Sequence, residues 1–214
     1  MAISDLFRRR DESEPAEPGA APALTSPTKA LPKFLASLKL RERPVLLDLG
    51  PVVGPNLTFF GERRGCKILV EDLFSDLDRH VRGGKLAELP AFFETRFTQG
   101  DATVDGILCW DVFDYLDRAS AQALAKQLTR ILRPDGVLLA FFGTSTPAPV
   151  APVYHKRIVE DDSTLRHREY PAAAGKQPPL QNRDITRMFE PLRVSEQFLL
   201  KTNVREVLLR KPPA

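Results

Sequence analysis

Residues 44–72 constrain the fold of this chain more than any other stretch. An apolar run, Val45-Leu46-Leu47, is followed by Asp48-Leu49-Gly50 and a short turn that closes at Gly54. A segment with helical character comes next, and a second apolar run then ends in Glu71-Asp72. A strand, a glycine-bearing turn, a helix and a strand closed by an acid form the nucleotide-binding half of a doubly wound parallel sheet.

Each part of this unit has a physical role toward a ligand. Glycine adopts backbone angles that a side chain forbids, and it lets a ligand approach the main chain closely. The free N–H groups that begin the following helix point toward the same place. A carboxylate at the tip of the second strand can accept hydrogen bonds from the two hydroxyls of a ribose.

The residues from Val45 to Gly54 resemble the first motif of class I S-adenosylmethionine-dependent methyltransferases, which is an acid, any residue, and Gly-x-Gly-x-Gly. Asp48 matches the acid, Gly50 the first glycine and Gly54 the last. Val52 stands where the family has its middle glycine. Because that glycine lies close to the cofactor in the family, we expect the valine to crowd it.

Three later segments extend the resemblance over roughly residues 29–210. Residues 104–111 are similar to the family's fourth strand, in which the aspartate, here Asp105, is mostly architectural. Residues 132–139 match the family's helix–turn–strand pattern Leu-Lys/Arg-Pro-Gly-Gly and are the most specific local match. Two expected strands at 193–200 and 204–209 suit the antiparallel ending of the family.

The resemblance implies one α/β domain at residues 28–211: a doubly wound, mostly parallel Rossmann-like sheet of about seven strands with an antiparallel last strand and helices on both faces. It also implies S-adenosyl-L-methionine as the cofactor.

Glu71 is favoured for the ribose contact, because the family's acid follows the strand directly; the alternative is a surface acid. Trp110 is either a pocket wall or a core residue. The implied cofactor-binding residues are Asp48, Gly50, Gly54, Glu71, Asp72, Trp110 and Asp111.

Residues 85–99 match the family poorly. Family members have a third strand here, with an acid that contacts the adenine, whereas this segment has the pattern of a helix or loop. Asp101 is badly placed to replace that acid. Arg96 and the phenylalanines at 92, 93 and 97 are candidates for stacking, although core packing is favoured for the phenylalanines.

Residues 1–27 precede the expected domain and are predicted to be disordered, because residues 11–27 are rich in Pro, Ala, Glu and Ser. Apolar residues followed by Arg8-Arg9-Arg10 suit either a tip in weak contact with a partner or membrane surface, or a frayed end. The charge follows the apolar residues, unlike a secretory signal. Ser26 and Pro27 are expected to cap and begin the next helix.

Composition narrows the class of protein. The 214 residues suffice for one sizeable core, and a net charge of +3 is too small to indicate a nucleic-acid partner. No apolar run approaches the ~20 residues of a membrane span. Cys66 and Cys109 adjoin predicted strands, so we expect buried thiols and a cytoplasmic protein. No metal-binding set is proposed.

Three functions compete at this point. The first is S-adenosylmethionine-dependent methyl transfer to a small molecule or protein, which depends on positioning and leaves the catalytic residue unassigned, with Asp111 and Tyr154 as candidate bases. The second is a catalytically inactive methyltransferase-like binding or scaffold protein, suggested by Val52 and the missing adenine acid. An NAD-dependent oxidoreductase is weaker, because residues 50–54 lack Gly-x-Gly-x-x-Gly.

Residues 143–180 are expected to form an insertion over the carboxyl edge of the sheet, including a small irregular hairpin. Family members place substrate-recognition elements there. The spacing assigns no role to the polar and aromatic side chains of this insertion, which are His155, Lys156, Arg157, His167, Arg168 and Tyr170.

Overall fold

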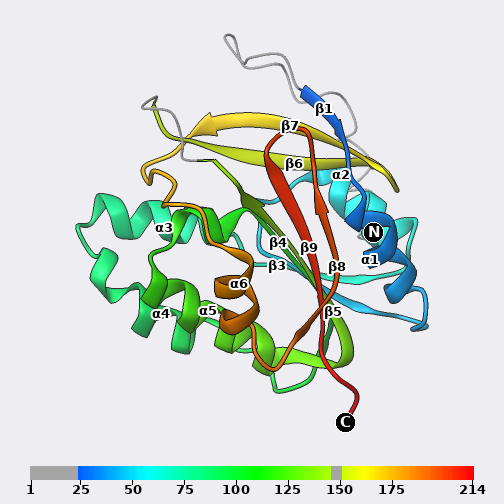
Figure 1. Ribbon diagram of the computed structural model, residues 1–214. Helices are drawn as coiled ribbons and strands as arrows, with labels where there is room; N and C mark the ends of the chain where they lie inside the picture. The colour runs from blue at the N-terminus through cyan, green and yellow to red at the C-terminus, as the bar shows by residue number, and fades with distance from the viewer. Residues whose placement is uncertain (1–23, 146–150) are drawn as a thin grey trace, which may run out of the picture.

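The computed structural model describes residues 24–145 and 151–214 (Figure 1). The basic tip and most of the Pro-rich arm therefore lie outside the described residues. The helical elements are α1 (Ala30–Leu38), α2 (Gly54–Leu57) with a π-helical turn (Thr58–Glu62), α3 (Leu73–Arg82), a 3-10 turn (Leu86–Glu88), α4 (Leu89–Arg96), a 3-10 turn (Val112–Tyr115), α5 (Arg118–Ile131) and α6 (Asn182–Met188).

The strands form two sheets. Strands β2 (Val45–Asp48), β3 (Lys67–Val70), β4 (Val104–Trp110), β5 (Leu132–Gly143), β8 (Arg193–Leu199) and β9 (Val204–Arg210) make a six-stranded sheet in the order β3-β2-β4-β5-β9-β8. Strands β1 (Leu24–Pro27), β6 (Val153–Asp161) and β7 (Thr164–Pro171) make a three-stranded antiparallel sheet in the order β1-β7-β6.

The large sheet has the predicted topology with one strand fewer. Strands β3, β2, β4 and β5 are parallel, and β9 lies antiparallel between β5 and β8. This antiparallel insertion confirms the expected ending of the domain. The expected count of about seven strands is wrong for this sheet, because the described residues between β3 and β4 form α3, a 3-10 turn and α4 and no strand.

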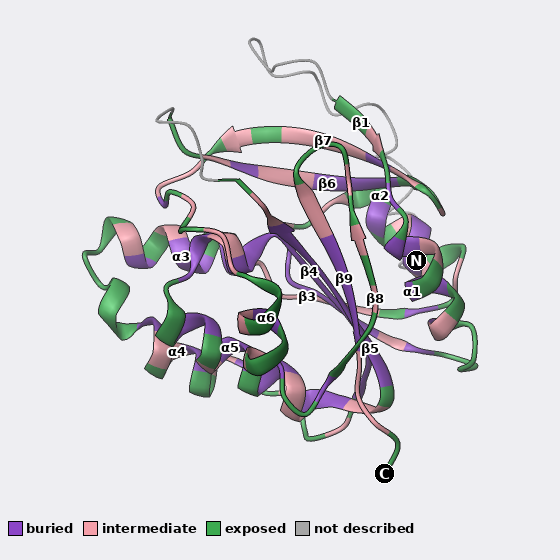
Figure 2. Cartoon of the chain, viewed as in Figure 1, coloured by how far each residue is buried: buried purple, intermediate pink, exposed green. Residues whose placement is uncertain are grey.

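Helices cover both faces of the large sheet, as expected (Figure 1). All seven residues of β4 are buried, which explains its apolar composition in the centre of the sheet (Figure 2). One apolar cluster joins the sheet to α3, α4, α5 and α6, and a second joins its other face to α1 and the π-helical turn. Asp105 is architectural, as predicted: its buried carboxylate accepts the Val45 N–H at 2.9 Å and pairs with Arg133 at 3.0 Å.

The start of α1 differs from the prediction. Ser26 and Pro27 belong to β1, and the helix begins at Ala30. The buried Glu206 of β9 caps it instead, accepting the N–H groups of Lys29 and Ala30 at 2.8 Å each. A carboxylate at a helix N-terminus satisfies free donors and complements the helix dipole. Because β1 pairs with β7, the ordered part of the chain also begins before residue 28.

The three-stranded sheet lies over the carboxyl edge of the large sheet, where the insertion was expected (Figure 1). Its hairpin is more regular than predicted, since β6 and β7 pair along almost their whole lengths. The buried Asn56 of α2 donates to the carbonyl of Arg157 and accepts the N–H of Val159, both at 2.8 Å. The Tyr115 hydroxyl donates to the carbonyl of Val153 at 2.7 Å. These bonds attach β6 to α2 and to the 3-10 turn that follows β4.

Both cysteines, Cys66 and Cys109, are buried free thiols, as predicted. Burial raises the pKa of each thiol above its ordinary value, so both stay protonated at neutral pH. Among the described residues, no helix is long and apolar enough to span a membrane.

Candidate functional site

The carboxyl ends of β2, β3 and β4 meet at one edge of the large sheet. The Glu71 N–H donates to the Asp48 carbonyl at 2.8 Å, and the Leu73 N–H donates to the Leu49 carbonyl at 3.2 Å. On the other side, the Leu49 N–H donates to the Leu108 carbonyl at 2.9 Å. The glycine turn after β2 therefore lies directly beside the acid that follows β3 and the tip of β4.

Asp48 organises the turn from inside. One of its carboxylate oxygens, Oδ1, accepts the Gly50 N–H at 2.9 Å and the Trp110 Nε1–H at 2.6 Å. Its side chain is buried, and burial raises its pKa from 3.8 to about 6, although the bonds from Gly50 and Trp110 oppose this change. Asp48 thus supports the turn and the indole, and its bonded oxygen faces the protein.

Val52 does not fill the turn. Val52 is 63% exposed, so it is not packed into the turn, and the crowding of the cofactor expected at this position stays a prediction. A side chain added at Gly54 would meet no heavy atom within 4 Å, so the space beside this residue is open. The part of the turn near Gly54 is therefore accessible.

Glu71 follows β3 directly, as predicted, and it is part of a network. Its Oε2 accepts from Arg96 at 2.6 Å and its Oε1 from Gln99 at 2.9 Å. Arg96 also pairs with the buried Asp76 at 2.7 Å, so its guanidinium bridges two acids, and the stacking considered for it stays a prediction. Asp72 is the N-cap of α3 and accepts the Ser75 N–H at 3.0 Å. Both acids are therefore bonded within the protein, and Glu71 as the ribose contact stays a prediction.

Trp110 ends β4 with an unusual backbone. The pairing of β4 with β5 shifts between Leu108 and Trp110, and Trp110 has a φ of 50°. A left-handed conformation at a bulky residue costs of order 1–3 kcal/mol. The indole lies over the glycine turn, where a Cβ at Gly50 would be 2.8 Å from the indole Cδ1. Trp110 is buried against this turn and Phe141.

Asp111 lies at the centre of a buried ionic cluster. Its carboxylate is 3.1 Å from the Arg157 guanidinium, 3.4 Å from the Lys176 ammonium and 3.5 Å from His155 Nδ1. Lys176 also pairs with Asp114 at 2.9 Å. Burial opposes ionisation of Asp111, yet Arg157, His155 and Lys176 hold the pKa of its carboxyl well below its usual range. Asp111 is therefore a fixed anion and a poor proton acceptor.

Tyr154 does not suit the role of base considered for it. The residue is fully buried, and its hydroxyl donates to Asp78 Oδ1 at 2.7 Å. Burial and the Asp78 carboxylate raise the pKa of this hydroxyl well above its ordinary value. Its ring packs against Phe74, Tyr115 and Tyr170. Tyr154 therefore anchors β6 to α3.

The seven predicted site residues lie along the same edge, but they do not all face one space. Glu71 and Gly54 border the accessible part, Asp48 and Trp110 bond to each other, and Asp111 faces the insertion. Sequence reasoning missed Lys176, Asn56 and Gln99, which join this edge through contacts 28–103 residues apart in the chain. No local pattern marks such residues.

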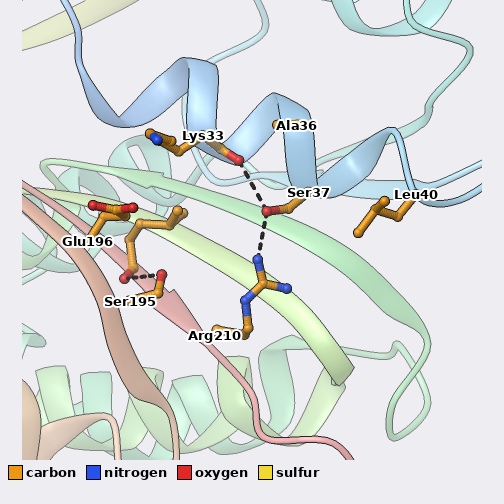
Figure 3. Close-up of a pocket in the computed structure, with 8 residues that line it drawn as sticks. Lys33, Ala36, Ser37, Leu40, Ser195, Glu196 and Arg210 are labelled. Carbon is orange, nitrogen blue, oxygen red and sulfur yellow. Dashed lines mark hydrogen bonds between the residues drawn. The ribbon is translucent and has the colours of Figure 1, made fainter.

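Two hollows of the described surface lie elsewhere. One, of about 270 Å³, lies between α1 and the β8–β9 strands, with Lys33, Ser37, Glu196 and Arg210 among its lining residues (Figure 3). Another, of about 460 Å³, lies beside the start of α6. Neither is lined by the residues of the glycine turn or by Glu71.

Comparison with known proteins identifies the family. A family profile described as a methyltransferase domain matches residues 24–191, more than three quarters of the 214 residues. The chain belongs to the methyltransferase domain family. The family and the α/β fold expected from the sequence of this methyltransferase are thereby confirmed. Among curated proteins, no relative matches it.

Solved structures resemble the methyltransferase at low identity. The 1,6-didemethyltoxoflavin-N1-methyltransferase of Burkholderia thailandensis, with bound 1,6-didemethyltoxoflavin and S-adenosylhomocysteine, has 15% identity and a TM-score of 0.49, covering 86% of this chain and 78% of that one. An S-adenosylmethionine-dependent methyltransferase of Clostridium acetobutylicum has 14% identity and a TM-score of 0.49, covering 84% and 91%. The family assignment rests on the domain match.

The residues of this edge can be tested for their fit to an adenosyl group. Each carboxylate oxygen of Glu71 accepts one bond from the protein and retains a second lone pair for a ribose hydroxyl. The space beside Gly54 is open. The set therefore fits a nucleoside at Gly54 and Glu71, while the indole of Trp110 covers the turn at Gly50.

Proposed function

We propose that this methyltransferase binds S-adenosylmethionine at the carboxyl edge of β2, β3 and β4 and methylates an acceptor on the side of the three-stranded sheet. One observation carries the proposal: the 2.8 Å bond from the Glu71 N–H to the Asp48 carbonyl sets a ribose-type acid beside the glycine turn. The acceptor is a small molecule or a protein side chain. We also place the protein in the cytoplasm, because both of its cysteines are free.

In this proposal the chain contributes mainly by positioning. Glu71 holds the ribose hydroxyls, and the backbone around Gly54 borders the adenosyl group. S-adenosylmethionine, when bound, supplies an electrophilic methyl carbon that a lone pair of the acceptor attacks directly. The Asp111 cluster lies beside the same edge, and its carboxylate lies 3.5 Å from Nδ1 of His155, whose side chain is 24% exposed. His155 is the group we propose to accept a proton from the acceptor.

The second candidate is a binding or scaffold protein without catalysis. The observations that favour it are the indole over Gly50 and the helix α4 in place of a third strand. Both reduce the surface available to the cofactor, so binding of the adenosyl group is the property that separates the two functions.

Calorimetric titration with S-adenosylhomocysteine tests the proposal. The wild-type protein should bind, and ligand at a hundred times its dissociation constant should add about 2.7 kcal/mol to the free energy of unfolding. Glu71→Gln should weaken binding at least tenfold, since Arg96 keeps Asp76 as a partner and the fold is retained. Glu88→Gln is a matched control, because this acid pairs only at the surface, with Lys85 at 3.4 Å. Equal affinity in Glu71→Gln would refute the ribose role, and absence of binding in the wild type would favour the scaffold.

A further inference from the structure

Trp110 covers the glycine turn at Gly50, the first glycine of the motif. Its indole Cδ1 and Nε1 lie 2.8 and 2.9 Å from the position of a Cβ at Gly50. These distances leave no room for a side chain at Gly50, and therefore none for an atom of a ligand on that side of the backbone. The turn is open at Gly54 and closed at Gly50.

The closed position is held by several independent contacts. The indole N–H donates to the buried Asp48 carboxylate at 2.6 Å, and the ring packs edge-on against Phe141 at 5.8 Å. The Arg157 guanidinium lies 4.9 Å above the ring of Phe141, and it also pairs with Asp111. Trp110 is thus held between the glycine turn and Phe141 of β5, and Arg157 of β6 packs on Phe141.

Other contacts connect these residues to the insertion. The Arg157 carbonyl and the Val159 N–H are bonded by Asn56, which lies on the helix that follows the glycine turn. Strand β6 is therefore attached to the helix that follows the glycine turn. The strained φ of 50° at Trp110 shows that the contacts of the closed position outweigh the preference of its own backbone.

We propose that Trp110 is a gate at the glycine turn, and that its indole must leave Asp48 before an adenosyl ligand can contact the Gly50 backbone. The inference rests on the proposed function and concerns the same site. A ligand that binds only the open arrangement has its apparent affinity reduced by the open fraction. A hydrogen bond to a buried carboxylate of this kind corresponds to a reduction of roughly ten- to hundredfold.

The chain provides its own reporter, because Trp110 is its single tryptophan. We would titrate the full-length protein with S-adenosylhomocysteine, follow tryptophan emission with excitation at a wavelength that spares tyrosine, and measure affinity by calorimetry. Saturation should shift the emission to longer wavelength and increase quenching by acrylamide, as a buried indole becomes hydrated. Trp110→Phe removes the N–H donor and Trp110→Ala removes the ring, so affinity should rise in that order, by roughly ten- to hundredfold for alanine.

Phe189→Leu is the matched control for loosening of the core. Phe189 is fully buried in the other apolar cluster, where it packs on Phe113, so its replacement should leave the affinity unchanged. Should Trp110→Ala fail to fold, Trp110→Phe decides the question.

Two results would overturn the gate. Binding by the wild type with unchanged emission and quenching would refute it and leave the proposed function intact. Absence of binding in the wild type and in both Trp110 variants would refute the gate together with the adenosyl site.

Discussion

Replacing Asp48 by asparagine should stabilise the protein at neutral and alkaline pH. The aspartate carboxylate is 4% exposed, and burial raises its pKa from 3.8 to about 6. Above pH 6 the folded protein therefore keeps a charge that burial disfavours. Asparagine has nearly the same shape and retains an Oδ1 that can accept the Gly50 and Trp110 N–H groups, but it carries no charge.

The size of the effect follows from the pKa. A shift of one pKa unit corresponds to about 1.4 kcal/mol. A pKa raised from 3.8 to about 6 therefore lowers the free energy of unfolding by about 3 kcal/mol when the carboxylate is charged. Because the folded pKa is the higher one, the folded state binds the proton first as the pH falls. The wild type should therefore gain stability from this group between about pH 6 and pH 4, whereas Asp48→Asn should not.

The difference between the two proteins is the quantity to measure. Urea unfolding of both at intervals from pH 8 to pH 4 gives free energies in which the other titrating groups largely cancel. Asp48→Asn should be more stable by about 3 kcal/mol at pH 8, or roughly 6–12 °C in melting temperature, and the difference should approach zero near pH 4. A difference that does not change with pH would refute the raised pKa. A variant less stable at pH 8 would show that the charged form is the favoured partner of Gly50 and Trp110.

Two further substitutions test the turn and the insertion. Val52→Gly should leave the affinity for S-adenosylhomocysteine within twofold of the wild type, because the valine is 63% exposed; a tenfold gain would show that it crowds the ligand. Asn56→Ala should destabilise the protein by about 2–5 kcal/mol in chemical unfolding, since it leaves the Arg157 carbonyl and the Val159 N–H without partners. Asn182→Ala, which loses one exposed contact, should change stability by less than about 0.5 kcal/mol, and equal losses in the two variants would contradict the attachment of β6.

The parts of the fold that sequence predicts best are those fixed by local pattern. The runs that became β2 and β4 are apolar because both faces of an inner parallel strand are covered, whereas β3 lies at the edge and is half-buried. Asp117 caps α5 through the Ser120 N–H at 2.8 Å, and Gly65 has a φ of 67° after the π-helical turn; aspartate and glycine are the residue types that favour these positions. The end of an apolar run also marks the end of a strand, so the position of Glu71 directly after β3 could be predicted in the same way.

Other features depend on contacts between distant residues and leave no local sign. The α1 cap was expected from Ser26, which lies next to it, but comes from Glu206, about 176 residues away in the sequence. Leu24–Pro27 has a composition typical of a disordered arm, yet it pairs with β7 because that strand presents a free edge. Arg96 has no sequence feature that reveals its two acidic partners, Glu71 and Asp76.

The site shows why a matched motif predicts a place more reliably than the role of each residue in it. Asp48 stands at the motif's acidic position, and the structure uses it to bind the Gly50 N–H and the Trp110 indole together. Leu108 and Trp110 alternate regularly along β4 and share one face of the sheet, and the shift in pairing and the positive φ at Trp110 fall where the strand ends beside the turn. The glycine turn, Asp48 and the end of β4 are therefore joined by hydrogen bonds into one unit. Any ligand that reaches the Gly50 backbone has to compete with a bond inside that unit, so its affinity measures the strength of the Asp48–Trp110 contact as well as its own contacts with the protein.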